Sequence, residues 1–485
     1  MCKKARLVSL LLALALSLAA CGGNTSSDST TPQDTSAVTT EPLKVDHLEE
    51  IPKVDFGGDK IRMVVQSQSD RPNIHTDEEN GEVVNDAMIV RDRKVSEMFS
   101  CELEYTVYDN RGTLYSDLTT LISAGEDAYD IIITTMVDGF GNLAANQMLY
   151  DLNSLDALKL SSEWWCQSMN ETMTFGDKIF ATSGPMSLCY CYTPYTMFAN
   201  LNMAEDYGVG DIYELVKSGK WTVDSMNSLM KDVYTDLNSN GTVDYDDRFP
   251  LTVTKESGIA FYIGCGMRLT EKTPTSAKLT LDSARSFDVL DKLNSIMKTD
   301  EVLCTDTIAN IQNSSDPKTA FFINSQALFC AAPIQWGVLK FRDMKDDYAI
   351  LPYPKFDEVQ DEYYTHLTAY FPIGIGIPAT CPRADKIASV MEALAYISNR
   401  DILPQINNTV LKAKIARDEN SAEMLDLLYK NTIVDFDCVF NIARTANTLR
   451  DYAVGESEDF ASSYASVKTQ AETQINDLMT KLIGE

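Results

Sequence analysis

The N-terminal part of the folded chain alternates between strand and helix patterns. Lys60–Gln66 and 129–133 are short, mainly apolar runs of the kind found in buried strands, and 103–107 alternates apolar with polar residues. Val83–Phe99 and 114–122 instead place their apolar residues at helical spacing. Strand, helix, strand, helix, strand is the pattern of an α/β domain built on a parallel sheet.

In such sheets, ligands bind in the loops beyond the carboxyl ends of the strands. The loop after the first strand carries Gln68, Asp70 and Arg71, and the loop after the third strand carries Asp138. Gln68, Asp70 and Asp138 are therefore candidate ligand-binding residues. For the two aspartates, a solvated loop carboxylate is an equally good interpretation.

A second α/β region begins near Pro185. It is predicted to contain strands at 188–192 and 371–377, and helices at 223–234, 287–297, 384–398 and 422–429. No repeat with the period of a solenoid is visible in the sequence. Two α/β lobes joined by more than one crossing fit this order of elements.

The first twenty residues have the pattern of a secretion signal. Three basic residues precede an uncharged apolar run at 7–20, which is shorter than the ~20 residues that a membrane-spanning helix needs. Leu-Ala-Ala at 18–20 followed by Cys21 looks like the bacterial lipobox, in which the cysteine is lipidated and becomes the first mature residue. An ordinary cleaved signal or a short anchor is the alternative. Residues 21–50 are predicted to be a flexible tether, because 22–41 has almost no apolar side chain.

The charge of the chain excludes some partners. It has 41 Lys and Arg against 71 Asp and Glu, a formal net charge of −30, so we expect no nucleic-acid ligand. Its 3 histidines leave few imidazoles for zinc binding or acid–base chemistry. Beyond Cys2 and Cys21, the remaining cysteines show no disulfide framework, and buried free thiols are predicted.

Residues 236–247 read DLNSNGTVDYDD and have the spacing of a calcium-binding loop, with glycine at the sharp turn. The predicted ligands are Asp236, Asn238, Asn240, Thr242, Asp244 and Asp247. Aspartate stands where such loops end in glutamate, which would weaken calcium binding or admit magnesium. Because 248–251 is not a helix start, we expect a lone, dockerin-like loop with a structural Ca²⁺. A polar surface turn is the alternative.

Motifs that carry catalysis are missing. The sequence contains no G-x-x-x-x-G-K-[ST], H-E-x-x-H, G-x-S-x-G or G-x-G-x-x-G. His366 is better interpreted as a hydrogen-bonded structural histidine than as a catalytic one. The sequence therefore favours a binding protein over an enzyme and indicates no organic cofactor. The 71 acidic residues leave open a carboxylate pair of the kind that hydrolyses glycosides.

Several short segments recur in a characteristic order. They are WW at 164–165, FGDKI at 175–179, YELVKSGKWT at 213–222, LKFRDM at 339–344 and ILPYPK at 350–355. With the lipobox and the calcium-like loop, they resemble the extracellular solute-binding proteins of bacterial ABC importers, the family that includes maltose-binding protein. The resemblance is greatest to a subgroup of gut-bacterial lipoproteins associated with carbohydrate uptake, and it spans nearly the whole chain. One departure is FANLN at 198–202, where such proteins often carry a Phe-Asn-Lys-like motif.

This resemblance implies an α/β, two-lobe periplasmic-binding-protein-like fold of type II, with a ligand cleft between lobes joined by hinge crossings. Lobe 1 would comprise 51–184 with 370–430, and lobe 2 would comprise 185–369 with 431–485. The implied function is a monomeric, lipid-anchored receptor on the extracellular face of the cell membrane that captures a carbohydrate, an oligosaccharide, for an ABC permease. A membrane-anchored glycan-acting enzyme, or a peptide or anion receptor on the same fold, is the alternative.

The resemblance also implies aromatic contacts with the ligand. Trp336 stands where sugar-binding relatives carry a stacking tryptophan, and Tyr192 and Tyr195 lie near the predicted crossing between lobes. Core packing is the alternative for all three, since large aromatic side chains are often half-buried. Tyr190 is assigned to the core.

Overall fold

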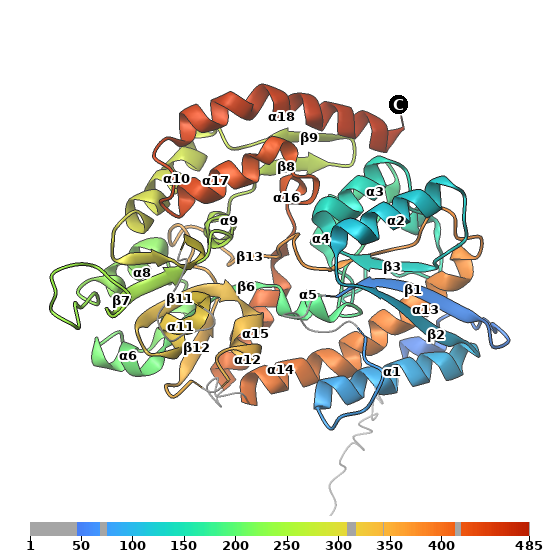
Figure 1. Cartoon of the computed structure of the whole chain (residues 1–485), viewed down its shortest axis with the longest axis horizontal. Coiled ribbons are helices and arrows are strands. Elements are labelled where there is room, and N and C mark those ends of the chain that lie inside the picture. The colour runs from blue at the N-terminus through green and yellow to red at the C-terminus, as the bar shows by residue number, and fades with distance from the viewer. Residues whose placement is uncertain (1–45, 68–74, 308–316, 343, 413–418, 485) are drawn as a thin grey trace, which may run out of the picture. The chain divides into compact units, whose positions relative to one another are not determined.

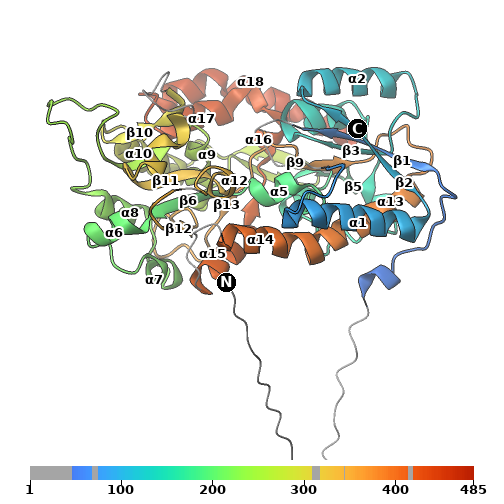
Figure 2. The same ribbon diagram turned by 60° about the horizontal axis from the view of Figure 1, so that its bottom comes forward.

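The computed structural model describes residues 46–67, 75–307, 317–342, 344–412 and 419–484. Asp46–Glu485 form one compact unit, whose helices and strands are drawn in Figures 1 and 2. Among the described residues, no helix is both long enough and apolar enough to cross a membrane.

The first sheet has four strands in the order β14-β3-β1-β2. They are β1 (Lys60–Gln66), β2 (Glu102–Tyr108), β3 (Ile131–Thr134) and β14 (Gly374–Gly376). Strand β1 is parallel to β2 and β3, with Met63 opposite Ile131, and β14 is antiparallel to β3. Helices α1 (Val83–Phe99) and α13 (Ala384–Ile397) lie on one face, and α2 (Arg111–Ser123) lies on the other (Figures 1 and 2). This double cover explains the apolar runs in β1 and β3.

The second sheet has five strands in the order β10-β7-β11-β6-β12. They are β6 (Tyr195–Asn200), β7 (Phe249–Val253), β10 (Val302–Cys304), β11 (Ala327–Pro333) and β12 (Tyr348–Leu351). Strand β7 is parallel to β10 and β11, whereas β6 is antiparallel to β11 and β12. Every residue of β6, β7, β11 and β12 is buried, so this sheet lies in the interior and shares one hydrophobic core with the first sheet.

Three crossings connect the surroundings of the two sheets, and they lie next to one another. One precedes β6, one runs from β13 (Thr365–His366) to β14, and one contains β15 (Thr432–Ile433). Strand β13 pairs in parallel with β15, and a bridge joins Pro194 to Leu367. The predicted residue boundaries of the two lobes stay predictions, because Asp46–Glu485 is one compact unit.

The remaining elements are mostly short. The other hairpin strands are β4 (Thr174–Phe175), β5 (Lys178–Ile179), β8 (Thr270–Thr273) and β9 (Ser276–Leu279). The other α-helices are α3 (Gly141–Ala145), α4 (Gln167–Thr172), α5 (Leu188–Tyr192), α6 (Leu201–Asp206), α7 (Ile212–Lys217), α8 (Val223–Met230), α9 (Ser257–Gly264), α10 (Ala284–Met297), α11 (Pro317–Ile323), α12 (Ile334–Leu339), α14 (Leu403–Lys412), α15 (Glu419–Lys430), α16 (Phe436–Phe440), α17 (Thr445–Ala453) and α18 (Phe460–Ile483). The 3-10 and π-helical turns are η1 (His47–Glu49), η2 (Met136–Phe140), η3 (Leu152–Ser154), η4 (Thr305–Thr307), η5 (Ser398–Ile402) and η6 (Ile442–Arg444).

One predicted strand is wrong. Leu188–Tyr192 forms the short helix α5, and the strand begins later, at Tyr195. All five residues of α5 are buried, so their alternation of residue types does not reflect one buried and one exposed face. Periodicity cannot distinguish a short buried helix from a short buried strand.

The predicted strand at 371–377 is shorter in the structure, where only Gly374–Gly376 pair with β3. Its glycines allow the backbone to approach η2 closely. A Cβ atom on Gly374 would lie 2.3 Å from the ring of Phe140, and one on Gly376 would lie 2.7 Å from it. Side chains at these two positions would therefore push the sheet away from Phe140.

A buried carboxylate fastens the start of the folded chain to helix α13. Glu392 is fully buried and accepts hydrogen bonds from His47 Nε2 (2.8 Å), the indole nitrogens of Trp164 (3.1 Å) and Trp165 (3.0 Å), and the backbone of Lys159 (3.1 Å). A buried charge needs such partners. We call Glu392 with these four donors the N-terminal clamp. It explains the tryptophan pair in the sequence as a packing feature.

Nine cysteines lie in the described part of the chain, and each is free. All but Cys101 are buried. Burial raises the pKa of the thiols, as at Cys304, where it reaches about 11. These side chains therefore behave as small apolar residues rather than as nucleophiles.

Candidate functional site

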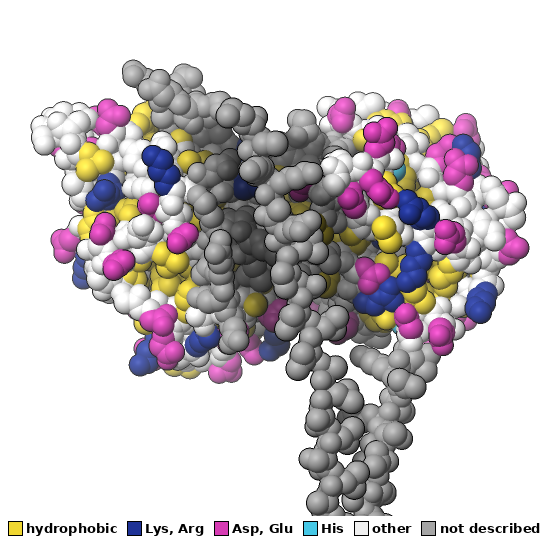
Figure 3. Space-filling model, turned by 90° about the horizontal axis from the view of Figure 1, so that it is seen from below, with side chains coloured by type: hydrophobic (Ala, Val, Ile, Leu, Met, Phe, Trp, Pro, Cys, Tyr) yellow, Lys and Arg dark blue, Asp and Glu magenta, His cyan; other side chains and the backbone are white. Residues whose placement is uncertain are grey.

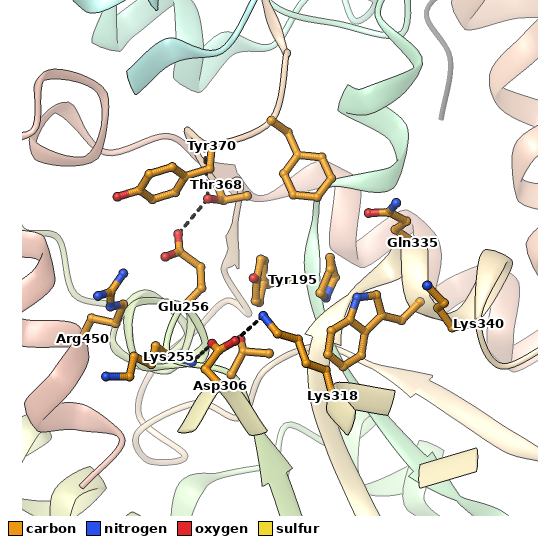
Figure 4. A pocket seen from close by; sticks show the side chains of 14 residues that line it. Tyr195, Lys255, Glu256, Asp306, Lys318, Gln335, Lys340, Thr368, Tyr370 and Arg450 are labelled. Carbon is orange, nitrogen blue, oxygen red and sulfur yellow. Dashed lines mark hydrogen bonds and ion pairs between the residues drawn. The ribbon is translucent and has the colours of Figure 1, made fainter. Parts of the chain in front are cut away.

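The candidate site is a pocket at one edge of the second sheet. Strands β7, β10 and β11 are parallel and end at Val253, Cys304 and Pro333, so their carboxyl ends meet at the same edge. The antiparallel strand β6 begins at this edge, where Tyr195 pairs with Pro333. The pocket has a volume of about 590 Å³. It is lined by Tyr195, Thr254, Lys255, Glu256, Asp306, Lys318, Pro333, Gln335, Trp336, Lys340, Thr368, Tyr370, Phe371 and Arg450 (Figure 4).

Four of these residues are aromatic, and they come from different elements. Tyr195 opens β6, Trp336 lies in α12, and Tyr370 and Phe371 lie in the crossing that leads to β14. Trp336 is half-buried. Its helix lies close to β6, because a Cβ atom on Gly337 would be 2.8 Å from the ring of Phe198. Tyr370 is half-buried as well, whereas Tyr195 and Phe371 are buried. Aromatic rings in the wall of a cavity can pack against the apolar faces of a cyclic ligand.

Glu256 carries a negative charge into the pocket. Its side chain is 13% exposed, and its Oε1 accepts hydrogen bonds from His366 Nε2 (2.9 Å) and Thr368 Oγ1 (2.7 Å). Burial opposes ionisation, but these hydrogen bonds outweigh it and hold the pKa of Glu256 below its usual value. Nδ1 of His366 is buried without a partner among the described residues, so we place the imidazole proton on Nε2.

Asp306 organises the opposite wall. Its Oδ1 forms an ion pair with Lys318, and its Oδ2 accepts a hydrogen bond of 2.8 Å from the backbone of Lys255. Asp306 follows β10, and Lys255 follows β7, so this bond joins two neighbouring strand ends. The charged groups at this wall are therefore held in place by the sheet.

The structure brings together two of the predicted ligand-binding residues. Tyr195 and Trp336 line the same pocket. Tyr192 does not line it, since it lies in α5 with 5% of its surface exposed, and burial raises its pKa. Asp138 lies in η2, but its side chain is outside the described part of the structure, as are Gln68 and Asp70 altogether.

The sequence analysis missed the charged residues of the pocket. Lys255, Glu256, Asp306, Lys318 and Arg450 look like solvated loop or helix residues in the sequence, and no motif joins them. One feature of the sequence could have pointed to two of these residues. Only Thr254 separates Lys255 and Glu256 from the end of a buried parallel strand, β7, and α/β sheets place their ligands beyond such strand ends.

The predicted metal ligands lie in a loop that is tied together by its own side chains. Asp244 accepts hydrogen bonds from the amides of Asn238 (3.1 Å) and Asn240 (2.5 Å), and Asp236 accepts one from the backbone of Gly241 (2.8 Å). Asp247 is fully buried and accepts a hydrogen bond from Tyr234 (2.8 Å). The backbone hydrogen bond from Asp246 and the amides of the two asparagines lower the pKa of Asp244.

The side chains of this loop are not arranged as a ready-made metal site. No group of three or more His, Cys, Asp and Glu side chains suited to a metal ion occurs within the described ranges. As expected, no helix starts directly after the loop; it leads instead into β7, a strand that was not predicted. Calcium binding by Asp236, Asn238, Asn240, Thr242, Asp244 and Asp247 stays a prediction.

No protein-family model and no curated protein sequence matches the chain. Several solved structures, however, are similar to it. An ABC substrate-binding protein from Listeria monocytogenes in complex with cycloalternan has a TM-score of 0.53 and 13% identity, over 88% of this chain and 99% of that one. The galacto-N-biose/lacto-N-biose I-binding protein of Bifidobacterium longum in complex with lacto-N-biose has a TM-score of 0.57 and 12% identity, over 87% and 98%. A family 1 extracellular solute-binding protein from Bifidobacterium longum subsp. infantis has a TM-score of 0.53 and 13% identity, over 88% and 100%.

These likenesses cover most of each chain and establish the fold. The chain has the α/β fold of the sugar-binding ABC solute-binding proteins, which is the type II periplasmic-binding-protein-like fold. The fold class predicted from the sequence, and the resemblance on which it rested, are confirmed at this level.

Proposed function

We propose that the protein is the substrate-binding component of an ABC importer and that it captures a carbohydrate in this pocket for delivery to the permease. The observation that carries the proposal is the pocket itself. Four aromatic side chains and six charged ones line a cavity at the carboxyl edge of the second sheet, on a fold whose solved neighbours include complexes with cycloalternan and lacto-N-biose. Aromatic faces with nearby hydrogen-bonding groups suit a sugar ring.

Binding would favour a closed arrangement of the two sheets. The pocket is built mainly from residues around the second sheet, but Tyr370 and Phe371 lie on the crossing to β14 of the first sheet. From the first-sheet side, the guanidinium of Arg111 in α2 lies 5.9 Å from the ring of Tyr370. A ligand that contacts both sides stabilises the closed state over the open one, and this mechanism breaks no covalent bond.

Export and anchoring complete the proposal. Residues 1–20 would be removed as a signal, and Cys21 would carry the lipid that holds a monomeric receptor at the extracellular face of the membrane. Two acyl chains provide stable anchoring, whereas one gives only reversible binding. Labelling of cells with radioactive palmitate tests this part, with Cys21→Ala as the variant that should lose both the label and the membrane association.

The calcium-like loop is proposed to bind one structural Ca²⁺. Supporting this, Asp236, Asn238, Asn240 and Asp244 already lie within hydrogen-bond contact of one another or of the loop backbone. Side-chain oxygens gathered in one loop are the ligands that a hard cation prefers. The ion would brace the connection between α8 and β7 and would take no part in ligand binding.

The test is ligand binding by the full-length protein in detergent. Thermal unfolding would be measured against neutral and acidic oligosaccharides, and each sugar would be recovered and analysed by mass spectrometry. At a hundred times the Kd, a ligand should stabilise the protein by ~2.7 kcal/mol. Stabilisation by a sugar that is recovered intact supports the receptor. A degraded sugar would support the glycan-acting enzyme, and a panel without effect would contradict carbohydrate binding.

A further inference from the structure

The pocket reverses the charge balance of the chain. Acidic residues outnumber basic ones by 71 to 41 over the sequence, and on the face drawn in Figure 3 side chains of both signs are interspersed. The pocket lining instead contains Lys255, Lys318, Lys340 and Arg450 against two carboxylates, Glu256 and Asp306. The lining therefore presents more cations than carboxylates to a ligand, while the carboxylates of Asp451 and Glu456 lie next to two of these cations but outside the lining.

The two carboxylates of the lining already form hydrogen bonds or ion pairs within the protein. Both oxygens of Asp306 are engaged, one by Lys318 and the other by the backbone of Lys255. One oxygen of Glu256 accepts two hydrogen bonds, from His366 and Thr368. Much of the acceptor capacity of the charged lining is therefore used inside the protein rather than offered to a ligand.

The cationic groups can only donate. Lys255 Nζ lies 3.8 Å from Asp451 and 3.8 Å from Glu456, too far for a hydrogen bond, and Arg450 Nε donates to Asp451 at 3.2 Å. Asp451 and Glu456 balance these two cations, but neither carboxylate lines the pocket. Ammonium and guanidinium groups have no acceptor atoms. The lining is therefore rich in donors.

Figure 4 shows these groups distributed around the pocket, with Arg450 and Lys255 on one side of Asp306 and Lys318 and Lys340 on the other. A neutral sugar hydroxyl both donates and accepts, and it needs acceptors as well as donors. A carboxylate or sulfate only accepts, and its bonds to cationic donors are about twice as strong as neutral ones. A donor-rich lining thus matches an acidic ligand better than a neutral one.

We propose that the ligand is an anionic oligosaccharide, whose carboxylate or sulfate groups are bound by the lysines of this pocket while its rings pack against the aromatic residues. This inference rests on the proposed carbohydrate-binding function and narrows it to a chemical class.

The experiment compares ligands that differ only in charge. Binding to the full-length protein is measured by calorimetry with tetragalacturonate and its fully methyl-esterified form, and with a sulfated carrageenan tetrasaccharide and its desulfated form. Maltotetraose and cellotetraose serve as neutral references. The charged member of at least one pair should bind about tenfold more tightly than its neutral counterpart, the size of one charge-assisted hydrogen bond. The pair that shows the difference identifies carboxylate or sulfate as the recognised group.

Variants separate charge recognition from folding. Lys340→Gln removes an exposed pocket cation next to the end of α12, and it should weaken binding of the charged member about tenfold more than binding of the neutral member. Lys278→Gln is the matched control, because Lys278 is 73% exposed on β9 and does not line the pocket. Unfolding midpoints of both variants should equal that of the unmodified protein.

The experiment distinguishes a failure of the anionic class from a failure of the proposed carbohydrate-binding function. If neutral oligosaccharides bind while the acidic ones do not, or if each pair binds equally, the anionic class is wrong and the carbohydrate receptor stands. If no sugar of either kind binds, the proposed function and this inference both fail. Equal loss of the charged and neutral members in Lys340→Gln would also overturn the role given to that cation.

Discussion

Trp336 is the residue on which ring stacking depends. It is half-buried in the pocket, and its ring lies 6.3 Å from that of Phe341. We expect Trp336→Ala to weaken sugar binding by about 2 kcal/mol, roughly thirty-fold in Kd, because an apolar contact area is lost. Trp336→Phe, which keeps a ring, should recover part of the affinity. Unchanged calorimetric affinity in the alanine variant would show that the side chain only packs.

Asp437 makes the free energy of unfolding depend on pH between about 4 and 8. The side chain is fully buried, and one of its oxygens has no partner among the described residues. Burial, with the neighbouring Asp435, raises its pKa to about 8. The folded protein therefore keeps a proton that the unfolded chain releases near pH 4, so stability falls as the pH rises from about 4 to 8.

Asp437→Asn removes this titration. At pH 8, we expect the free energy of unfolding of the variant, measured by urea denaturation, to exceed that of the unmodified protein by more than about 2 kcal/mol. Near pH 4, the two values should be equal. Asp288→Asn, a change at an exposed position of α10, should have no such effect. An equal pH profile in Asp437→Asn would contradict a buried, protonated Asp437.

Among the elements, the loop between α8 and β7 carries the calcium prediction. CaCl₂ at about 1 mM should stabilise the protein by roughly 0.4–1.4 kcal/mol, the range expected for a Kd of about 10⁻³–10⁻⁴ M. Asp236→Ala should abolish the rise in unfolding temperature, because it removes the first predicted ligand. Asp246→Asn lies in the same loop outside the predicted ligand set, so it should retain the rise. An unfolding temperature that is the same with and without calcium would refute the site.

The elements also show what the sequence could and could not predict. Lys60–Gln66 and Val83–Phe99 were predicted with the bounds that the structure has. The helix is 17 residues long, enough for the helical spacing of its apolar residues to show, and the apolar strand follows the turn signal of Gly57 and Gly58. Leu188–Tyr192 was assigned to the wrong class, because burial on all sides erases the pattern. Trp336 was placed near the ligand by resemblance, whereas Lys318 and Arg450 come together only through the tertiary fold.

For the whole molecule, the prediction concerns closure. Tyr370 and Phe371 lie on a crossing between the sheets, so a bound ligand should bring the sheets together. The radius of gyration from small-angle X-ray scattering should fall when saturating ligand is added. Trp336→Ala, at the same ligand concentration and unsaturated, should show a smaller decrease. A radius that stays constant in the unmodified protein at saturation would exclude closure on binding.

The N-terminal clamp has a mechanical consequence. Glu392 and its four donors hold the beginning of the folded chain on α13, which lies on the first sheet. A force transmitted through the segment before Asp46 would load the first sheet and its helices, and would bypass the crossings at β13 and β15. The first sheet would then stay fixed relative to the point of attachment, and the second sheet would move relative to it. Tension on the proposed lipid anchor would then leave the proposed opening and closing of the pocket undisturbed.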